Sequence, residues 1–191
     1  IPAHMRMISD VSGAGDTDNA SFTIVGNRLT SAAVFNFETK QTYSVRVRST
    51  DQGGLSVEHN YTVNITNVNE TPTNLTLTGS TIAENQPGST PVGTFTTTDP
   101  DTADTFTYSL ISGAGSTDNA SFSIVGNQLR AASSFDFESK TSYSVRVRAT
   151  DQGGLLFQNT FTIAVTDAKV APTDIVIRPA DSQIGQPPNP A

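Results

Sequence analysis

Apolar and polar residues alternate along most of this chain with a period of two, the pattern of β-strands that bury one face. In YSVRVRAT, Tyr143, Val145 and Val147 fall on one face, whereas Arg146 and Arg148 fall on the other. The segments FTYSLI, SFSIV and FTIAV alternate in the same way, and turns such as VGN and DQGG separate them. No segment sustains the 3.6-residue period of an amphipathic helix. The pattern predicts an all-β protein.

Long stretches of sequence occur twice along the chain. SGAGDTDNASFTIVGNRL begins at Ser12 and returns as SGAGSTDNASFSIVGNQL at Ser112. YSVRVRSTDQGGL at Tyr43 returns as YSVRVRATDQGGL at Tyr143, again 100 residues later and without a gap. A unit of this size is a whole domain, larger than the repeat of a solenoid. We therefore predict tandem copies of one domain.

The repeat places the domain boundaries. We predict repeat 1 over residues 6–66, a connector over 67–72, repeat 2 over 73–168, and a linker with the first strand of a following repeat over 169–191. Repeat 2 has the strand number and spacing of an antiparallel β-sandwich. Its seven predicted strands lie near residues 73–77, 91–98, 104–111, 120–124, 127–131, 142–149 and 157–166.

Repeat 1 is predicted to lack its first two strands, because the chain opens at the counterpart of the third. That third strand also lacks part of its apolar face, since Arg6 and Asp10 occupy the positions of Phe106 and Leu110. Such a sandwich exposes core residues and open strand edges. The segment PTDIVIR, residues 172–178, matches the first strand of a repeat. We predict that it pairs with the open repeat 1 of another molecule.

Composition excludes several classes of function. The chain has no cysteine, which excludes disulfides, thiolate zinc sites and cysteine catalysis. Its formal charge of −7 leaves no basic patch for nucleic acid, and no apolar run is long enough to span a membrane. An acidic chain rich in Thr, Ser and Asn suits an extracellular setting or a cation ligand. The opening IPAHM is interpreted as a cloning remnant on an excised fragment.

The acidic residues of repeat 2 fall mostly near predicted strand ends. They are Glu84 in IAEN, Asp99 and Asp101 in TTDPD, Asp136 and Glu138 in FDFE, and Asp151 in ATDQGG. Each of these taken singly is also explained as an ordinary turn residue. Calcium, however, prefers six to eight oxygens from carboxylates, amides and carbonyls, which is what a cluster of such residues offers.

Taken in order with the connector NVNETP, these motifs resemble the calcium-binding motifs of the cadherin repeat. More specifically, the chain resembles the cadherin-like tandem repeats of large bacterial surface and secreted proteins. The resemblance implies two tandem cadherin-like β-sandwiches of Ig-like Greek-key type, located outside the cell or on its surface. It also implies Ca²⁺ ions bound between consecutive repeats.

The resemblance also implies a ligand set. At the junction it comprises Asn36, Glu38, Asn67, Asn69 and Glu70 from repeat 1 and the connector, with Asp99, Asp101 and Asp151 from repeat 2; Glu84, Asp136 and Glu138 are the corresponding residues one repeat later. Repeat 1 has no counterpart of Glu84. Asn36 and Asn67 stand where Asp136 and Asp167 stand 100 residues later. We therefore expect fewer or weaker ions than in a complete junction.

The second connector departs from the first. It reads VTDAKVAPTDI, so Lys169 and Val170 replace Asn69 and Glu70. A cation and an apolar side chain stand where ligands stood one repeat earlier. This connector is predicted to bind calcium poorly or not at all, and to mark a flexible joint or the end of the array.

Three functions are considered for this sequence. The first is a structural and adhesive module that binds calcium and associates with itself or with another cell. The second is a carbohydrate-binding accessory module, whose partner would be a surface polysaccharide; the absence of Trp and an aromatic content of 7% argue against it. The third is an enzyme. Two histidines and no nucleophile elbow argue against catalysis, and Asp136 with Glu138 is better explained by ion binding.

Overall fold

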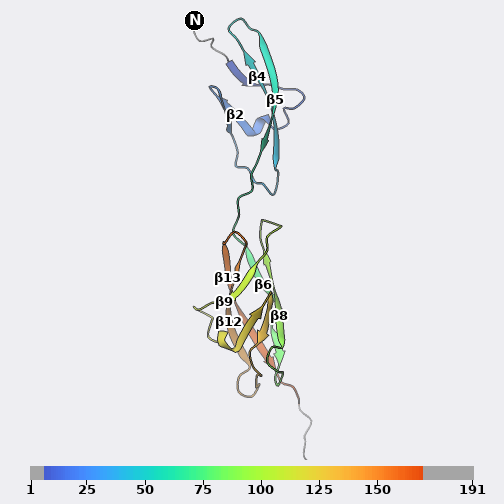
Figure 1. Ribbon diagram of the computed structural model, residues 1–191, viewed down its shortest axis with the longest axis vertical. Helices are drawn as coiled ribbons and strands as arrows, with labels where there is room; N and C mark the ends of the chain where they lie inside the picture. Colours follow the sequence, from blue (N-terminus) through green and yellow to red (C-terminus); the bar gives the residue numbers. More distant parts are fainter. Residues whose placement is uncertain (1–6, 170–191) are drawn as a thin grey trace, which may run out of the picture.

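The computed structural model describes residues 7–169, which form two β-rich units arranged end to end along the long axis (Figure 1). Repeat 1 contains β1 (Met7–Asp10), β2 (Phe22–Val25), β3 (Arg28–Ser31), β4 (Thr42–Thr50) and β5 (Ser56–Asn64). Repeat 2 contains β6 (Asn74–Thr78), β7 (Thr81–Ala83), β8 (Pro91–Thr98), β9 (Thr107–Leu110), β10 (Phe122–Val125), β11 (Gln128–Ala131), β12 (Ser142–Thr150) and β13 (Leu156–Thr166). The all-β prediction is confirmed. No helix in the described part of the chain is long and apolar enough to cross a membrane.

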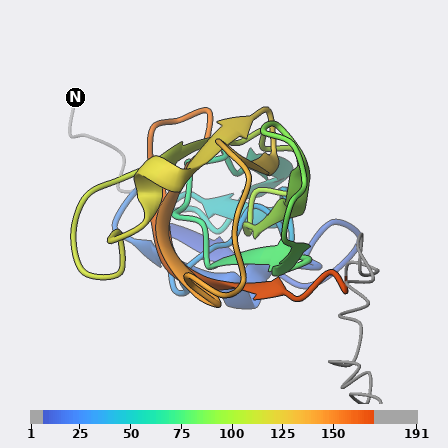
Figure 2. The ribbon, with the colours of Figure 1, turned by 90° about the horizontal axis from the view of Figure 1, so that it is seen from below.

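Repeat 2 is a complete sandwich of two four-stranded sheets. One sheet has the order β10-β11-β8-β6, and the other has the order β7-β13-β12-β9. Seen along the long axis, the strands surround the interior of the domain (Figure 2). The inward residues predicted from the alternation fill that interior: Val145, Val147 and Ile163 have no exposed surface, and Leu129 from the facing sheet is equally buried.

One strand of repeat 2 is absent from the sequence prediction. The structure has eight strands where seven were expected, because Thr81–Ala83 forms β7. This strand is only three residues long, too short for a period of two to be visible. It pairs with β13 in parallel, with Ile82 opposite Val165, and leads directly into Glu84.

Repeat 1 has only five strands in the described residues. A three-stranded sheet, β1-β4-β5, faces the two-stranded β2-β3. Within the described part of repeat 1 there are no counterparts of β6, β7 and β8, one strand more than predicted. β1 nevertheless forms and pairs with β4, with Asp10 opposite Val47. The consequence is a thin core: among the buried apolar residues, Val45 alone belongs to repeat 1, whereas thirteen belong to repeat 2.

A polar network explains why the TDNAS motif occurs in both repeats. Asp118 accepts a hydrogen bond from the backbone N–H of Ser144 (2.8 Å) and forms an ion pair with Lys140. The side chain of Asn119 bridges two strands, since it accepts from the Arg146 N–H (3.0 Å) and donates to the Ile111 carbonyl (2.9 Å). This network holds the loop that carries the short 3₁₀ helix Asn119–Ser121 against β12.

The same lysine also closes an aromatic cluster. The rings of Phe122, Phe135 and Tyr143 lie within 6 Å of one another between centroids, and the Lys140 ammonium lies 4.6 Å from the Tyr143 centroid. Repeat 1 contains the same cluster of Phe22, Phe35 and Tyr43. Phe122 and Phe135 are buried, whereas Phe22, Phe35 and Tyr43 are half-buried in repeat 1, where the sheets are smaller.

Asp118→Asn is expected to destabilise the protein by about 1–2 kcal/mol at pH 7, because the charge-assisted bond with Lys140 is lost. Burial acts to raise the pKa of Asp118, but the bonds from Lys140 and Ser144 outweigh it, so its pKa lies below the ordinary value. A carboxyl with a lowered folded-state pKa stabilises the fold above its unfolded pKa and loses that effect as pH falls through the folded one. Urea unfolding at a series of pH values should therefore show the difference between variant and wild type vanishing below about pH 3. A difference that persisted at lower pH would contradict this account.

Candidate metal centre at the junction between the repeats

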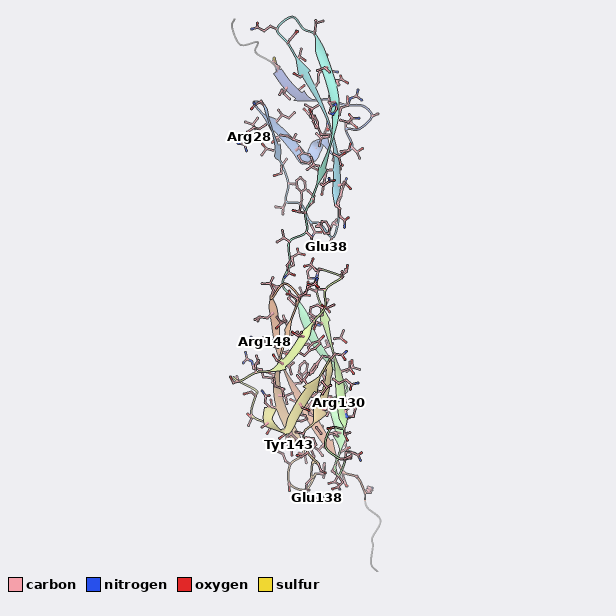
Figure 3. The ribbon with its side chains drawn as sticks, viewed as in Figure 1. Arg28, Glu38, Arg130, Glu138, Tyr143 and Arg148 are labelled. Atoms are coloured by element: carbon pink, nitrogen blue, oxygen red, sulfur yellow. The ribbon has the colours of Figure 1, made fainter. Side chains whose placement is uncertain are left out.

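Nine carboxylates gather in three clusters, each of which brings its ligand oxygens within 4.8 Å of one another. We name them by position. The upper cluster is Glu38, Glu70 and Asp101; the lower cluster is Asp99, Asp104 and Asp151; the distal cluster is Glu84, Asp136 and Glu138. Figure 3 shows Glu38 at the end of repeat 1 that faces repeat 2, and Glu138 at the opposite end of repeat 2. Two clusters therefore lie at the junction and one lies a whole repeat away.

The upper cluster joins three parts of the chain: the turn before β4, the connector and the loop between β8 and β9. Asp101 is its buried centre, with 6% of its surface exposed. Its carboxylate accepts hydrogen bonds from the backbone N–H of Glu70 (2.8 Å) and from the Asn67 amide (2.7 Å). These bonds lower the pKa of Asp101 and keep it ionised.

Glu70 has the opposite environment. Burial, followed by the nearby carboxylates of Glu38 and Asp101, raises its pKa above the ordinary value. One of its oxygens, Oε2, is buried and has no hydrogen-bond partner among the described residues. A buried carboxylate oxygen without a partner is costly, so this position is suited to a ligand that supplies positive charge.

The lower cluster is held by two loops at the junction end of repeat 2, one between β8 and β9 and one between β12 and β13, and by the connector. Asp151, 6% exposed, accepts from the Leu155 N–H (2.9 Å) and from the Asn69 amide (3.0 Å). Asp104 accepts from the Gln152 amide (2.7 Å). Burial raises the pKa of Asp104 despite that bond, with the charges of Asp101, Asp151 and Asp99 acting in the same direction. Asp99 Oδ2 and Asp104 Oδ2 are both buried without a partner among residues 7–169.

Asp104 is absent from the predicted ligand set. It follows DPD by three residues in DPDTAD, and the turn between β8 and β9 folds it back against Asp99 and Asp151. The backbone bond from the Asp104 N–H to the Asp101 carbonyl (3.1 Å) closes that turn. The sequence did contain a signal for Asp104, namely a third acidic residue within one loop, because a tight turn places residues i and i+3 side by side.

A cleft of about 240 Å³ lies between the repeats and reaches both junction clusters. Its walls include Glu38 and Asn67 from the upper side and Asp101, Asp104 and Gln152 from repeat 2. All five of these side chains carry oxygen. The structure therefore brings together five predicted junction residues that carry carboxylates, namely Glu38, Glu70, Asp99, Asp101 and Asp151, and sets the amides of Asn67 and Asn69 beside them.

Asn36 lies outside these clusters. Its amide oxygen accepts a hydrogen bond from the Thr39 N–H (2.7 Å) and so caps the local turn. Asp136, its counterpart, caps the same turn through Ser139, but it also belongs to the distal cluster. A ligand role for Asn36 remains a prediction, whereas its role in the turn is visible.

The distal cluster is built by β7 and the turn before β12. Glu84, only 4% exposed, accepts backbone bonds from Phe137 (3.0 Å) and Ala168 (3.0 Å). The backbone N–H of Glu138 acts to lower its own pKa, but the charge of Glu84, burial and Asp136 outweigh it, and the pKa is raised. Lys169, in the second connector, is exposed, and Val170 lies outside the described residues.

The three clusters share one electrostatic property. Elsewhere in residues 7–169 the ion-paired carboxylates, Asp18, Glu58 and Asp118, each contact a Lys or Arg. None of the nine clustered carboxylates forms an ion pair with a side chain in that range. Uncompensated carboxylates at this spacing repel one another, and oxygen-only ligand sets suit a hard divalent cation such as Ca²⁺. The residues present therefore fit a calcium site.

Comparison with known proteins bears on the fold. Residues 79–169 match the cadherin domain. The fold of the chain is similar to that of the EC1–4 fragment of PcdhgB3 (TM-score 0.65, 22% identity, 86% of this chain and 41% of that one). It is also similar to EC1–2 of human protocadherin-24 (TM-score 0.66, 18% identity, 86% and 83%) and to EC1–2 of human mucin-like protocadherin (TM-score 0.58, 21% identity, 86% and 85%).

These similarities establish the cadherin fold but not the function. The evidence for function comes from the residues of the site. The chain spans about two fifths of the length of the PcdhgB3 fragment. No curated protein sequence matches it. The matched cadherin domain comprises the distal cluster, the lower cluster and Asp101, whereas Glu38 and Glu70 precede it.

Gly153 is expected to be required for the contact between the connector and the cadherin domain. A Cβ at this position would lie 2.3 Å from Asn69 Cγ, so Gly153→Ala must displace the amide that bonds Asp151, at a cost of about 1 kcal/mol. The matched control is Gly53→Ala, whose Cβ would meet only Asp51 Oδ1 at 3.3 Å. The side-chain amide resonances of Asn69 in an NMR spectrum should shift in the first variant and remain in place in the second. Unchanged resonances in Gly153→Ala would contradict the contact.

Proposed function

We propose that this chain is a calcium-binding structural and adhesive module of an extracellular protein, in which Ca²⁺ fixes two consecutive cadherin-like repeats end to end. The supporting observation is that six carboxylates from both repeats and the connector meet at the junction without a cationic side chain among them. Three buried carboxylate oxygens there lack any partner in the described part of the chain. Proposed boundaries are repeat 1 over 6–66, the connector over 67–72 and repeat 2 over 73–168.

The upper and lower clusters would each hold cations. Glu38, Glu70 and Asp101 would supply the first set of ligands, and Asp99, Asp104 and Asp151 the second. When bound, the ion supplies the positive charge that offsets carboxylate repulsion and ties together the segments that carry them. Glu70 and Asp104, whose pKa values are raised, would lose any bound proton as the cation enters.

The connector contributes amides as well as charge. Asn67 and Asn69 turn their NH₂ groups toward Asp101 and Asp151, respectively. These donors partly offset the negative charge. Rotation of each amide would present its oxygen to a cation instead, so the connector could also supply ligands. Asn36 and Asn67, which carry no charge, would make the site weaker than one with aspartates in their place.

The distal cluster is proposed to bind calcium more weakly. It has three carboxylates, but the connector that follows it offers exposed Lys169 in place of Asn69. A cation on the connector repels a second cation nearby. The outer end of repeat 2 would therefore be a looser joint, and the first junction would be the rigid one.

A rigid junction is suited to an adhesive role. A chain of repeats held straight can carry a binding surface away from a cell, and a bacterial surface or secreted protein is the proposed source. Sites in extracellular modules bind calcium with a Kd of about 10⁻⁴–10⁻³ M. When the concentration of free calcium is about one hundred times Kd, one such site stabilises the folded protein by about 2.7 kcal/mol.

Calorimetric titration tests the calcium site with a matched pair of variants. Asp151→Asn is expected to weaken calcium binding at the junction by about tenfold or more, equivalent to ~1.4 kcal/mol, because a buried carboxylate ligand is lost. Asp51→Asn changes the same motif in repeat 1, where the carboxylate makes the same local bond to Leu55 N–H (2.9 Å) but belongs to no cluster. It should bind calcium as the wild type does.

Two results would refute the proposal. One is the absence of heat on titration of the wild type, together with a melting temperature that calcium does not change. The other is an equal effect of Asp51→Asn and Asp151→Asn, which would show that the motif acts only through its local turn.

A further inference from the structure

One sheet of repeat 2 carries positive charge on its outer face and no carboxylate. The strands β7, β13, β12 and β9 contain two charged residues, Arg146 and Arg148, which both lie on β12. Their neighbours Val145 and Val147 are buried, so alternation places both arginines on the outer face. Figure 3 shows Arg148 on the flank of repeat 2, between the junction and the distal end. Neither arginine forms an ion pair within residues 7–169.

Repeat 1 shows what the same pair of arginines binds when a carboxylate is present. Glu58 on β5 lies opposite Arg48 on β4 and forms ion pairs with both Arg46 and Arg48. Its Oε1 accepts a hydrogen bond from Arg48 Nε (2.8 Å), and its Oε2 accepts one from Arg46 Nε (3.1 Å). The hydrogen bonds from Arg46 and Arg48 lower the pKa of Glu58 and keep it ionised. The two guanidinium groups thus form a receptor for one carboxylate.

Repeat 2 keeps the arginines but replaces the carboxylate. Gln158 lies opposite Arg148, at the position that Glu58 has in repeat 1. The single side-chain oxygen of Gln158 accepts from Arg146 Nη2 (2.7 Å), and its nitrogen can donate but not accept. Arg148 is half-buried, and its Nε is buried without a partner in the described part of the chain. A buried donor without a partner is costly, so Arg148 is suited to an acceptor from outside the domain.

The loop before β10 holds Arg146 in place. Arg146 Nη1 donates to the Ala114 carbonyl (3.3 Å), and a Cβ at Gly113 would lie 2.8 Å from the same nitrogen. Arg146 in turn orients the Gln158 amide, because it takes the oxygen and leaves the NH₂ group to donate. Arg148 and this amide therefore offer N–H groups from adjacent strands of one face, an arrangement that a carboxylate can accept.

The face is better suited to an acidic peptide than to an acidic polysaccharide. Repeat 1 shows directly that a Glu side chain fits the paired arginines. A sugar ring, by contrast, would find no aromatic surface on which to stack. The aromatic residues of the four strands all pack against the core of repeat 2, namely Tyr108, Tyr143, Phe157 and Phe161.

We propose that Arg148 and the Gln158 amide form a binding site for a carboxylate that an acidic segment of a partner protein supplies as an Asp or Glu side chain. Arg148 donates to the carboxylate through its guanidinium group, and Gln158 donates through its NH₂ group. The partner thereby supplies the charge that Glu58 supplies internally in repeat 1. The contact uses neither calcium nor the junction, so it goes beyond the proposed function and identifies an interaction surface on the side of the module.

NMR titration with a blocked tetraglutamate peptide tests the site. The buffer has low ionic strength and contains no calcium, and it omits citrate and EDTA because both are carboxylates themselves. The Nε–Hε resonance of Arg148 should shift with a Kd of about 1 mM, and added salt should weaken the binding. A blocked tetraglutamine peptide is the matched control, and it should cause no shift at the same concentration.

Exchange of one residue between the repeats tests the assignment. Gln158→Glu supplies the carboxylate internally, so it should weaken peptide binding at Arg148 at least tenfold and raise the melting temperature. Glu58→Gln makes the reverse change and should create a second site at Arg48. The double variant Glu58→Gln/Gln158→Glu should therefore move the peptide-induced shifts from Arg148 to Arg48. All these variants keep the four arginines, and dispersed backbone spectra check that each is folded.

The C-terminal segment contains two further side-chain carboxylates, Asp174 and Asp181. It lies outside the described residues, as does PTDIVIR, whose pairing with repeat 1 of another molecule stays a prediction. Asp174→Asn/Asp181→Asn should bind the peptide with the affinity of the wild type. Tighter binding by this variant would show that the chain's own carboxylates compete for the site, and would overturn its assignment to a partner protein.

The proposal fails if tetraglutamate leaves the Arg148 resonance in place, or if Gln158→Glu binds the peptide as tightly as the wild type. It also fails if oligogalacturonate shifts Arg148 and tetraglutamate does not, because the occupant would then be an acidic polysaccharide. Since the titrations are made without calcium, these failures are distinct from a failure of the calcium site.

Discussion

Repulsion between carboxylates at the junction is the constraint on which the arrangement of this protein depends. Asp101 and Asp151 are almost fully buried where the two repeats meet, and Glu70 and Asp104 beside them hold raised pKa values. No ion-pair partner for them lies in residues 7–169. The fold can keep such groups together only by hydrogen bonds from backbone and amide donors, or by a cation, and the geometry provides for both.

The two repeats share sequence but differ in what stabilises them. Repeat 2 has two complete sheets and nearly all of the buried apolar residues. Repeat 1 depends on its aromatic cluster, on the Asp18–Lys40 ion pair and on Arg46 and Arg48, which both pair with Glu58. Within residues 7–169, repeat 1 therefore depends on polar and aromatic contacts more than on a buried apolar core.

Much of this architecture could be predicted from the sequence, because the repeat identifies the domain and alternation identifies the buried face. Val145 and Val147 were assigned to the core on that basis and are fully buried. β7 was not predicted because a strand of three residues is too short to show the alternation of apolar and polar residues. Asp104 was missed although its acidic loop offered a local signal, because its proximity to Asp151, 47 positions away, depends on tertiary folding. The ligand roles of the clustered residues come from the resemblance to cadherin repeats. The structure adds where these residues lie relative to one another.

Small-angle X-ray scattering of the chain in chelator and in excess calcium tests the central claim, that a cation at the junction holds the repeats in line. The measurement is made at low protein concentration. Calcium should narrow the distribution of interatomic distances and extend it to a longer, better-defined maximum, and Asp151→Asn should abolish this change. Identical profiles in chelator and in calcium would contradict the account.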